Sequence, residues 1–79
     1  MRKEVHRAIV DRVILNGKHG PYAVARSEDL GMVTFSLLPS VWQEKSYPET
    51  GTWVVLYDLR KKRAGWRAQH GRYLRPSDE

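Results

Sequence analysis

The chain has 79 residues, with 14 Lys and Arg against 9 Asp and Glu, and it has no cysteine. This length allows one small domain whose core forms without disulfides, and the lack of thiols excludes cysteine-ligated metals and a cysteine nucleophile. No apolar run is long enough for a signal peptide or a membrane span, so the sequence predicts a cytoplasmic protein with no membrane partner.

The first predicted element covers residues 5–15. The β-branched side chains of Val5, Ile9, Val10 and Val13 favour a strand. Three of them also have helical spacing, which leaves a helix as the competing interpretation. Apolar residues occupy both strand phases near the end of the run, a pattern typical of a bulged or bent strand.

The second and third strands are predicted over residues 21–26 and 32–38. The proline at the start of the second suits a first strand position, where no ladder donor is lost. Apolar and polar residues alternate strictly along the third strand, which therefore has a core face and an outer face. The inward residues would be Val33, Phe35 and Leu37, and the outward ones Met32, Thr34 and Ser36.

Residues 39–45 are predicted to form one helical turn, with Ser40 as its cap and Trp42 as a plug at one end of a barrel. A central fourth strand is expected over residues 52–58. The fifth, over residues 63–74, should be interrupted at His70 and Gly71. The predicted domain spans residues 1–76, and residues 77–79 are predicted to be a frayed tail.

The predicted order is three strands, a short helical insertion and two more strands. This order indicates an all-β protein with the five-stranded, OB-like Greek-key barrel as its fold. An SH3-like barrel has a similar strand count and is the structural alternative.

The positive charge is concentrated near the C-terminal end. Residues 1–50 carry seven basic and six acidic side chains, whereas residues 51–79 carry seven basic and three acidic ones. Such a field attracts polyanions and speeds their encounter, which favours a nucleic-acid partner. The alternative is a solvated basic face that only keeps the protein soluble.

OB-folds bind nucleic acids through strands two and three and through the loops that join strands one to two and four to five. In this chain those loops are predicted over residues 16–20 and 60–65, and both are basic. They supply six candidate nucleic-acid-binding residues: Lys18 and His19 in the first, and Arg60, Lys61, Lys62 and Arg63 in the second.

Proteins that hold single strands stack bases on aromatic rings. Tyr22 is the first candidate for such a ring. The alternative is that Tyr22 packs at the barrel rim with its hydroxyl in contact with water. Trp66 either stacks a base or covers the end of the barrel. Phe35, Trp53 and Tyr57 are assigned to packing. The candidate phosphate contacts are Arg26, Arg67, Arg72 and Arg75.

Nothing in the sequence predicts catalysis, a metal site or a cofactor. His6, His19 and His70 lack the spacing of metal ligands, and no glycine-rich loop is followed by Lys and Ser or Thr. The acidic residues are scattered among turns and strand faces and show no acid–base pair. The sequence therefore predicts a protein that is not an enzyme.

Three short segments resemble OB-fold RNA-binding domains of the S-one type, the group that includes translation initiation factor one. They are NGKHGPYAV at 16–24, GMVTFS at 31–36 and GTWVV at 51–55. The resemblance implies that Tyr22, Thr34 and Lys62 or Arg63 contact RNA. Thr34 stands where the family commonly has a histidine, so one stacking contact is missing. Cold-shock domains are a more distant likeness.

Three functional hypotheses follow from these residues. The first is a nucleic-acid-binding module whose partner is single-stranded RNA or DNA. The second is a protein-interaction module in which Trp42, Trp53 and Trp66 form an aromatic groove. The third is an accessory subunit of a larger RNA or DNA machine, such as a ribonucleoprotein assembly.

Overall fold

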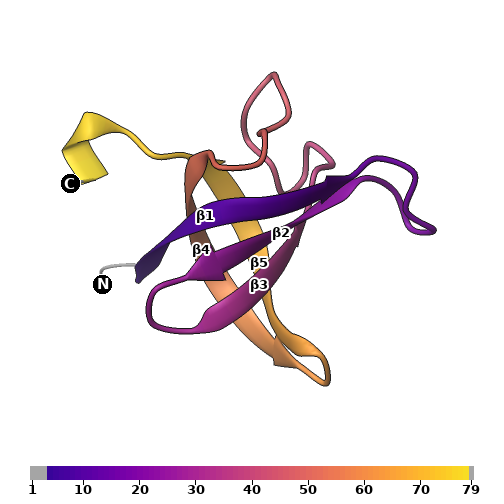
Figure 1. Cartoon of the computed structure of the whole chain (residues 1–79), viewed down its shortest axis with the longest axis horizontal. Helices are drawn as coiled ribbons and strands as arrows, with labels where there is room; N and C mark the ends of the chain where they lie inside the picture. The colour runs from indigo at the N-terminus through magenta and orange to yellow at the C-terminus, as the bar shows by residue number, and fades with distance from the viewer. Residues whose placement is uncertain (1–3, 79) are drawn as a thin grey trace.

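Five strands form nearly all of the regular structure (Figure 1). The computed structural model describes residues 4–78, so residues 1–3 of the predicted domain and residue 79 of the predicted tail lie outside it. The strands are β1 (Val5–Ile14), β2 (Tyr22–Ser27), β3 (Gly31–Ser36), β4 (Trp53–Lys62) and β5 (Gly65–Tyr73). A short 3-10 helix, η1 (Pro76–Asp78), follows them.

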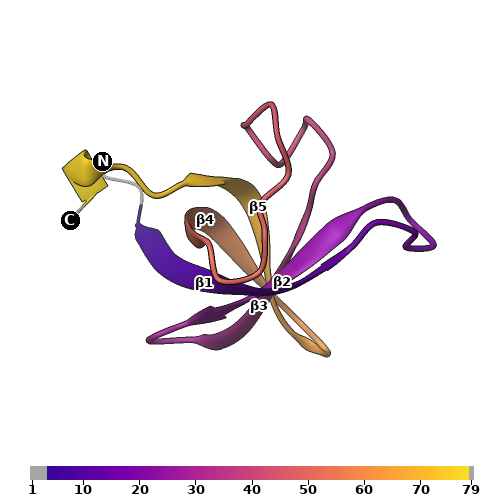
Figure 2. The same cartoon turned by 45° about the horizontal axis from the view of Figure 1, so that its top comes forward.

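The strands close into a barrel in the order β1-β2-β3-β5-β4. Neighbouring strands are antiparallel except β3 and β5, which pair in parallel. Because β5 lies between β3 and β4, the connection is a Greek key rather than an up-and-down meander, and Figure 2 shows the closed ring from a second side. The predicted all-β, five-stranded OB-like barrel is confirmed.

Strand β1 pairs with two neighbouring strands, β4 and β2. Its first half pairs with β4, and most of its length pairs with β2. The register against β2 shifts between Val10 and Arg12, which is the bulge that the mixed apolar phases predict. The backbone of Val10 bonds to residues 51 and 52, which lead into β4. The bulge therefore bends β1 where it changes partners.

The core contains the side chains that the alternation of apolar and polar residues predicts. Val33, Phe35 and Leu37 are buried, together with Val54 and Leu56 of β4. Trp42 is only 2% exposed and its ring centroid lies 5.6 Å from that of Phe35. The indole Nε1 donates to the carbonyl of Ser46 at 2.7 Å, which satisfies its one polar atom.

Residues 38–42 form a single turn, and no helix continues over residues 39–45. The backbone N–H of Trp42 donates to the Leu38 carbonyl at 2.9 Å, which closes one turn. The chain then pairs with β5 instead of continuing: Gln43 donates to Gly71, and Gly71 donates to Val41, both at 3.0 Å. These bonds use the groups that a helix would need.

Gly71 does not interrupt β5, contrary to the prediction. The strand runs on to Tyr73, and Gly71 lies beneath the Trp42 ring. A Cβ at this position would come within 2.9 Å of Leu56 Cδ2 and 3.3 Å of Trp42 Cε3. The glycine is needed because Trp42 packs against its backbone.

Strand β4 is longer than predicted and includes the basic residues that were assigned to a loop. It continues through Asp58, where φ is 59°, to Lys62. Only Arg63 and Ala64 lie between β4 and β5, and Gly65 has a φ of 130°. The expected loop is therefore a projecting hairpin.

The predicted frayed tail is ordered at Ser77 and Asp78. Both belong to η1, and the Asp78 carboxylate accepts hydrogen bonds from Arg72 at 2.7 and 2.9 Å. The ion pair holds the tail against the barrel. Across residues 4–78, no helix has the length and apolar character that a membrane crossing requires.

We expect Gly71→Val to lower the free energy of unfolding by about 1–3 kcal/mol, because a branched side chain must displace Trp42 or Leu56. Urea denaturation measures the change. Gln69→Val, on the same strand but only partly buried, is the control and should change stability by about 0.5 kcal/mol or less. Equal effects of the two substitutions would contradict this account of Gly71.

Candidate nucleic-acid interface

Five of the predicted binding residues come together on one side of the barrel. Lys18, His19, Tyr22, Thr34 and Arg67 line a concavity of about 400 Å³, with Gly17, Gly20, Pro21 and Ser36 completing its wall. We call this concavity the β2–β3 groove. Figures 1 and 2 show the β1–β2 loop and the β4–β5 hairpin projecting on this same side of the barrel.

The strand registers explain why these side chains meet. Tyr22 lies opposite Ser36, Thr34 lies opposite Arg67, and Arg67 lies opposite Arg60. Directly opposed residues share a face of a sheet, and their sequence neighbours point to the other face. The neighbours Ala23, Phe35 and Ala68 accordingly lie in the core. Alternation therefore produces both the groove and the core.

The backbone of the β1–β2 loop holds the Tyr22 ring in place. A Cβ on Gly17 would lie 2.9 and 3.0 Å from two ring carbons of Tyr22 and 2.6 Å from the Gly20 carbonyl oxygen. The loop is closed by a hydrogen bond from Gly20 N–H to the Gly17 carbonyl at 3.1 Å. The sequence predicts only a loop over residues 16–20, and the close approach of Gly17 to Tyr22 has no local signal in it.

The groove is positively charged. Lys18 and Arg67 line it, no acidic side chain does, and neither cation forms an ion pair with any of residues 4–78. Both cations remain available to an anion. Unpaired cations beside an aromatic ring are the combination that single-strand binding requires.

The β4–β5 hairpin adds cations, but only part of them face the groove. Arg60 lies opposite Arg67 and Lys62 lies opposite Gly65, so these two continue the outer face. Lys61 points the other way, and its Nζ lies 5.0 Å from the centroid of the Trp66 ring. Arg63 occupies the exposed turn. The predicted basic loop thus divides between two faces because it is strand.

Arg26 shares the outer face of β2 with Tyr22 but does not line the groove. It lies four residues further along, or about 13 Å at the rise of a strand. Arg26 is exposed and lies opposite Met32. It lies outside the groove, towards the β2–β3 turn.

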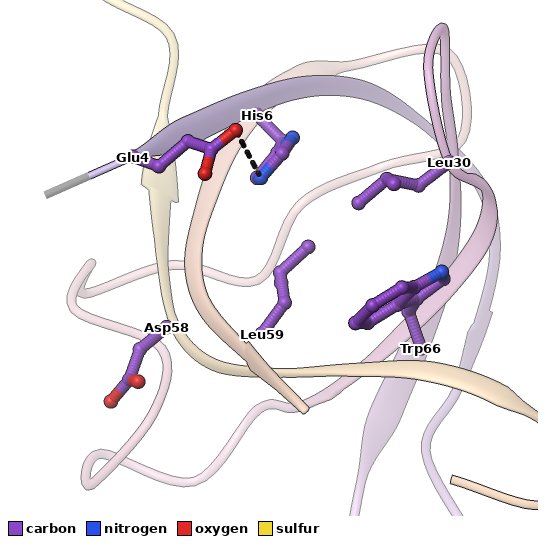
Figure 3. A pocket seen from close by; sticks show the side chains of 6 residues that line it. All are labelled: Glu4, His6, Leu30, Asp58, Leu59 and Trp66. Atoms are coloured by element: carbon purple, nitrogen blue, oxygen red, sulfur yellow. Dashed lines mark ion pairs between the residues drawn. The ribbon is translucent and has the colours of Figure 1, made fainter. Parts of the chain in front are cut away.

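Trp66 lies outside the groove. It is opposite Val33, on the inner phase, and lines a second cavity at the end of the barrel (Figure 3). Trp66 and Arg67 point to opposite faces, so Trp66 does not share the groove with Tyr22, and base stacking on Trp66 stays a prediction. Its alternative position, over the end of the barrel, is confirmed.

Arg72 and Arg75, two candidate phosphate contacts, are engaged within the protein. Arg72 donates to both Asp78 carboxylate oxygens, and its side chain is largely buried. Arg75 lies 3.8 Å from Glu44 and gives its backbone N–H to Asp78. These two arginines anchor the tail, and the structure does not place them at the groove.

The three tryptophans do not form a groove. Trp42 is in the core, whereas Trp53 begins β4 and is 40% exposed, contrary to its assignment to packing. Trp66 lies opposite Lys61, which is eight residues beyond Trp53 along β4. At the rise of a strand this separation is about 26 Å, so Trp53 and Trp66 are far apart. The aromatic groove of the protein-interaction hypothesis is absent from residues 4–78.

Tyr57, another aromatic assigned to packing, stacks on His70 with ring centroids 5.1 Å apart.

Comparison of the chain with models of known families, with curated proteins and with solved structures finds no match. The function therefore has to be argued from the groove. Within residues 4–78, no group of three or more His, Asp or Glu side chains is arranged to hold a metal ion.

We expect Gly17→Ala to displace the Tyr22 ring, because its methyl group would overlap the ring edge and the Gly20 carbonyl. The change should cost about 1–3 kcal/mol of stability and move the Tyr22 ring resonances in NMR spectra. Asn16→Ala, in the same exposed turn, is the control. Unchanged Tyr22 resonances in Gly17→Ala would show that the loop does not position the ring.

The ion pair between Arg72 and Asp78 leads us to expect a pH dependence of the folding stability. Hydrogen bonds from Arg72 and from the Arg75 backbone hold the pKa of the Asp78 carboxyl well below its ordinary value of 3.8. A lowered carboxyl pKa stabilises the folded state above the ordinary pKa, and this contribution is lost as the pH falls through the folded-state pKa.

Asp78→Asn should therefore unfold at lower urea concentrations than the wild type at neutral pH. The difference should shrink progressively below pH 3.8. Asp11→Asn, at an exposed side chain with no hydrogen-bond partner in residues 4–78, is the matched control. A difference between Asp78→Asn and wild type that stays constant as the pH falls would contradict this assignment.

Proposed function

We propose that the chain is a non-enzymatic module that binds single-stranded nucleic acid, RNA in the first instance, in the β2–β3 groove. The observation that carries the proposal is the convergence of Tyr22 with Lys18, His19 and Arg67 in one concavity that has no acidic lining. A base stacks on the Tyr22 ring, and the cations contact the flanking phosphates.

The shape of the groove favours a single strand. A base can stack on a protein ring only when it is released from its neighbours, and in a duplex both faces of each base are already stacked. The Tyr22 ring, held from one side by the β1–β2 loop, lines a concavity of about 400 Å³ that His19 also lines. The site accordingly takes unstacked bases.

The choice of RNA rests on the resemblance to S-one-type domains. Two of the positions that the resemblance assigns to RNA contact, Tyr22 and Thr34, line the groove, and a third, Lys62, extends its face. The proposed setting is the cytoplasm, either alone or within a ribonucleoprotein assembly. The structure supports this proposal through the placement of those residues.

We expect Tyr22→Ala to weaken binding to a single-stranded RNA oligonucleotide by about 1–3 kcal/mol, because it removes the stacking surface. Tyr22→Phe should retain most of the affinity. Tyr47→Ala is the matched control, since Tyr47 is exposed on the β3–β4 connection and does not line the groove. Fluorescence anisotropy measures all four proteins.

The salt dependence gives a separate readout in the same titrations. Arg67→Gln should reduce the slope of log K against log salt concentration by about 0.7, the value for one lost phosphate contact on a single strand. Duplex of the same sequence should bind more weakly. Equal losses for Tyr22→Ala and Tyr47→Ala, or binding that ignores salt, would overturn the proposal.

A further inference from the structure

The bulge in β1 determines which way the Arg12 side chain points. Val10 is buried in the core, so Arg12, two residues later, would also point into the core if the strand were regular. The register shift between Val10 and Arg12 reverses this alternation. Val13 packs against the core instead, and Arg12 is exposed and lies opposite Val24. Bulges commonly redirect a side chain in this way next to functional sites.

Arg12 is one end of a row of residues that crosses all five strands on the outer face of the barrel. The strand registers oppose the members of this row pairwise, in the order Arg12, Val24, Thr34, Arg67 and Arg60. We call them the arginine row. Neighbouring strands are about 4.8 Å apart, so the row is about 19 Å long when measured along the sheet. Thr34 and Arg67 line the β2–β3 groove, and the row therefore continues beyond the groove at both ends.

The three arginines of the row are available to an anion. All three are exposed, and none of them forms an ion pair with the described part of the chain, residues 4–78. This holds for Arg12 although Asp11 precedes it. A guanidinium matches the geometry of phosphate oxygens and stays charged at every physiological pH. The row thus provides phosphate contacts on either side of the Tyr22 strand.

A path of the nucleic acid along the strands is the competing geometry. Such a path would lead from Tyr22 to Arg26 on β2. Arg26 lies opposite Ile9 on β1 and Met32 on β3, so the neighbouring strands add no cation at that level. The arginine row has a cation on β1, on β5 and on β4. Since affinity for a phosphate backbone grows with the number of phosphates contacted, charge favours the path that crosses the strands.

We propose that Arg12 is a phosphate-binding residue, and that the bound single strand crosses the barrel along the arginine row from Arg12 to Arg60. This inference rests on the proposed function of the groove and adds the ends and the direction of the bound strand. Bases stack at Tyr22 beside the middle of the row, where Arg67 contacts the backbone. The β1 bulge then has a function, because it exposes a cation that a regular strand would bury.

The test compares four variants of the full chain: Arg12→Gln, Arg60→Gln, Arg26→Gln and Arg7→Gln. Arg7 is the matched control, because it is exposed on β1 but precedes the bulge and lies opposite Val55. Fluorescence anisotropy measures binding to an oligouridine of about eight nucleotides at several salt concentrations. Arg12→Gln and Arg60→Gln should each weaken binding about threefold to tenfold at low salt and reduce the salt slope by about 0.7. The other two variants should bind like wild type.

The length of the RNA gives a second readout. The dinucleotide UpU can fill the site at Tyr22 but is too short to reach both ends of the row. In NMR titrations with UpU, Arg12→Gln should bind like wild type, whereas Tyr22→Ala should bind more weakly. Arg12→Lys keeps the charge and should retain most of the affinity for the longer RNA.

The inference is overturned if Arg12→Gln binds the longer RNA as tightly as Arg7→Gln does, or if Arg26→Gln loses as much affinity as Arg12→Gln. It is also overturned if Arg12→Gln weakens UpU and the longer RNA equally. The groove itself has a different readout, the comparison of Tyr22→Ala with Tyr47→Ala. A loss at Tyr22 without a loss at Arg12 refutes only the path, whereas equal binding of the two tyrosine variants refutes the groove.

Discussion

The parallel contact between β3 and β5 decides which side chains of β5 reach the groove and which face the end of the barrel. Only three residue pairs close the barrel there, and they set the phase of β5 against β3. The pair Thr34–Arg67 brings an arginine to the groove, and the preceding pair, Val33–Trp66, turns the indole into the barrel end. Because side chains alternate along a strand, neighbouring residues of one hairpin serve two separate surfaces. The same closure leaves Gly71 beneath Trp42, which fills the other end of the barrel.

Charge is divided along the barrel in the same way. The groove side carries Lys18 and Arg67 without a carboxylate, whereas five acidic side chains line the two cavities that share His6. Arg7 also lines one of those cavities. The net charge of +5 is therefore unevenly distributed over the surface. Arg72 and Arg75 contribute to the total but are neutralised locally by Asp78 and Glu44.

The sequence predicted the elements better than their ends. Five strands, their order and the β1 bulge follow from alternation and β-branched residues, which are local signals. The extension of β4 to Lys62 was missed because charged residues weaken a strand pattern, although a two-residue turn supports them in a hairpin. The turn near Trp42 does not continue as a helix because Gly71, distant in sequence, takes the backbone bonds of Val41 and Gln43.

Within the candidate site, Lys18, His19 and Tyr22 meet in the groove because OB-like topology fixes which loops flank β2 and β3. The cations of the second predicted loop are divided between two faces because they lie in β4. The face of Trp66 depends on the β3–β5 register, which no local pattern specifies, so the sequence left its two positions open. Arg72 was misjudged for a similar reason, since its partner Asp78 lies in a segment expected to be frayed. Long-range pairing, rather than local preference, decided each of these residues.

The ion pair between Arg72 and Asp78 also determines where the chain leaves the domain. It turns η1 back towards β1, and Asp78 lines a common cavity with Val5 and Arg7. Figures 1 and 2 both show the two ends of the described chain on the side away from the projecting hairpins. A flanking domain, an affinity tag or a second copy in tandem can thus be joined at either end without covering the groove. This geometry suits the barrel to use as a building block in a longer polypeptide.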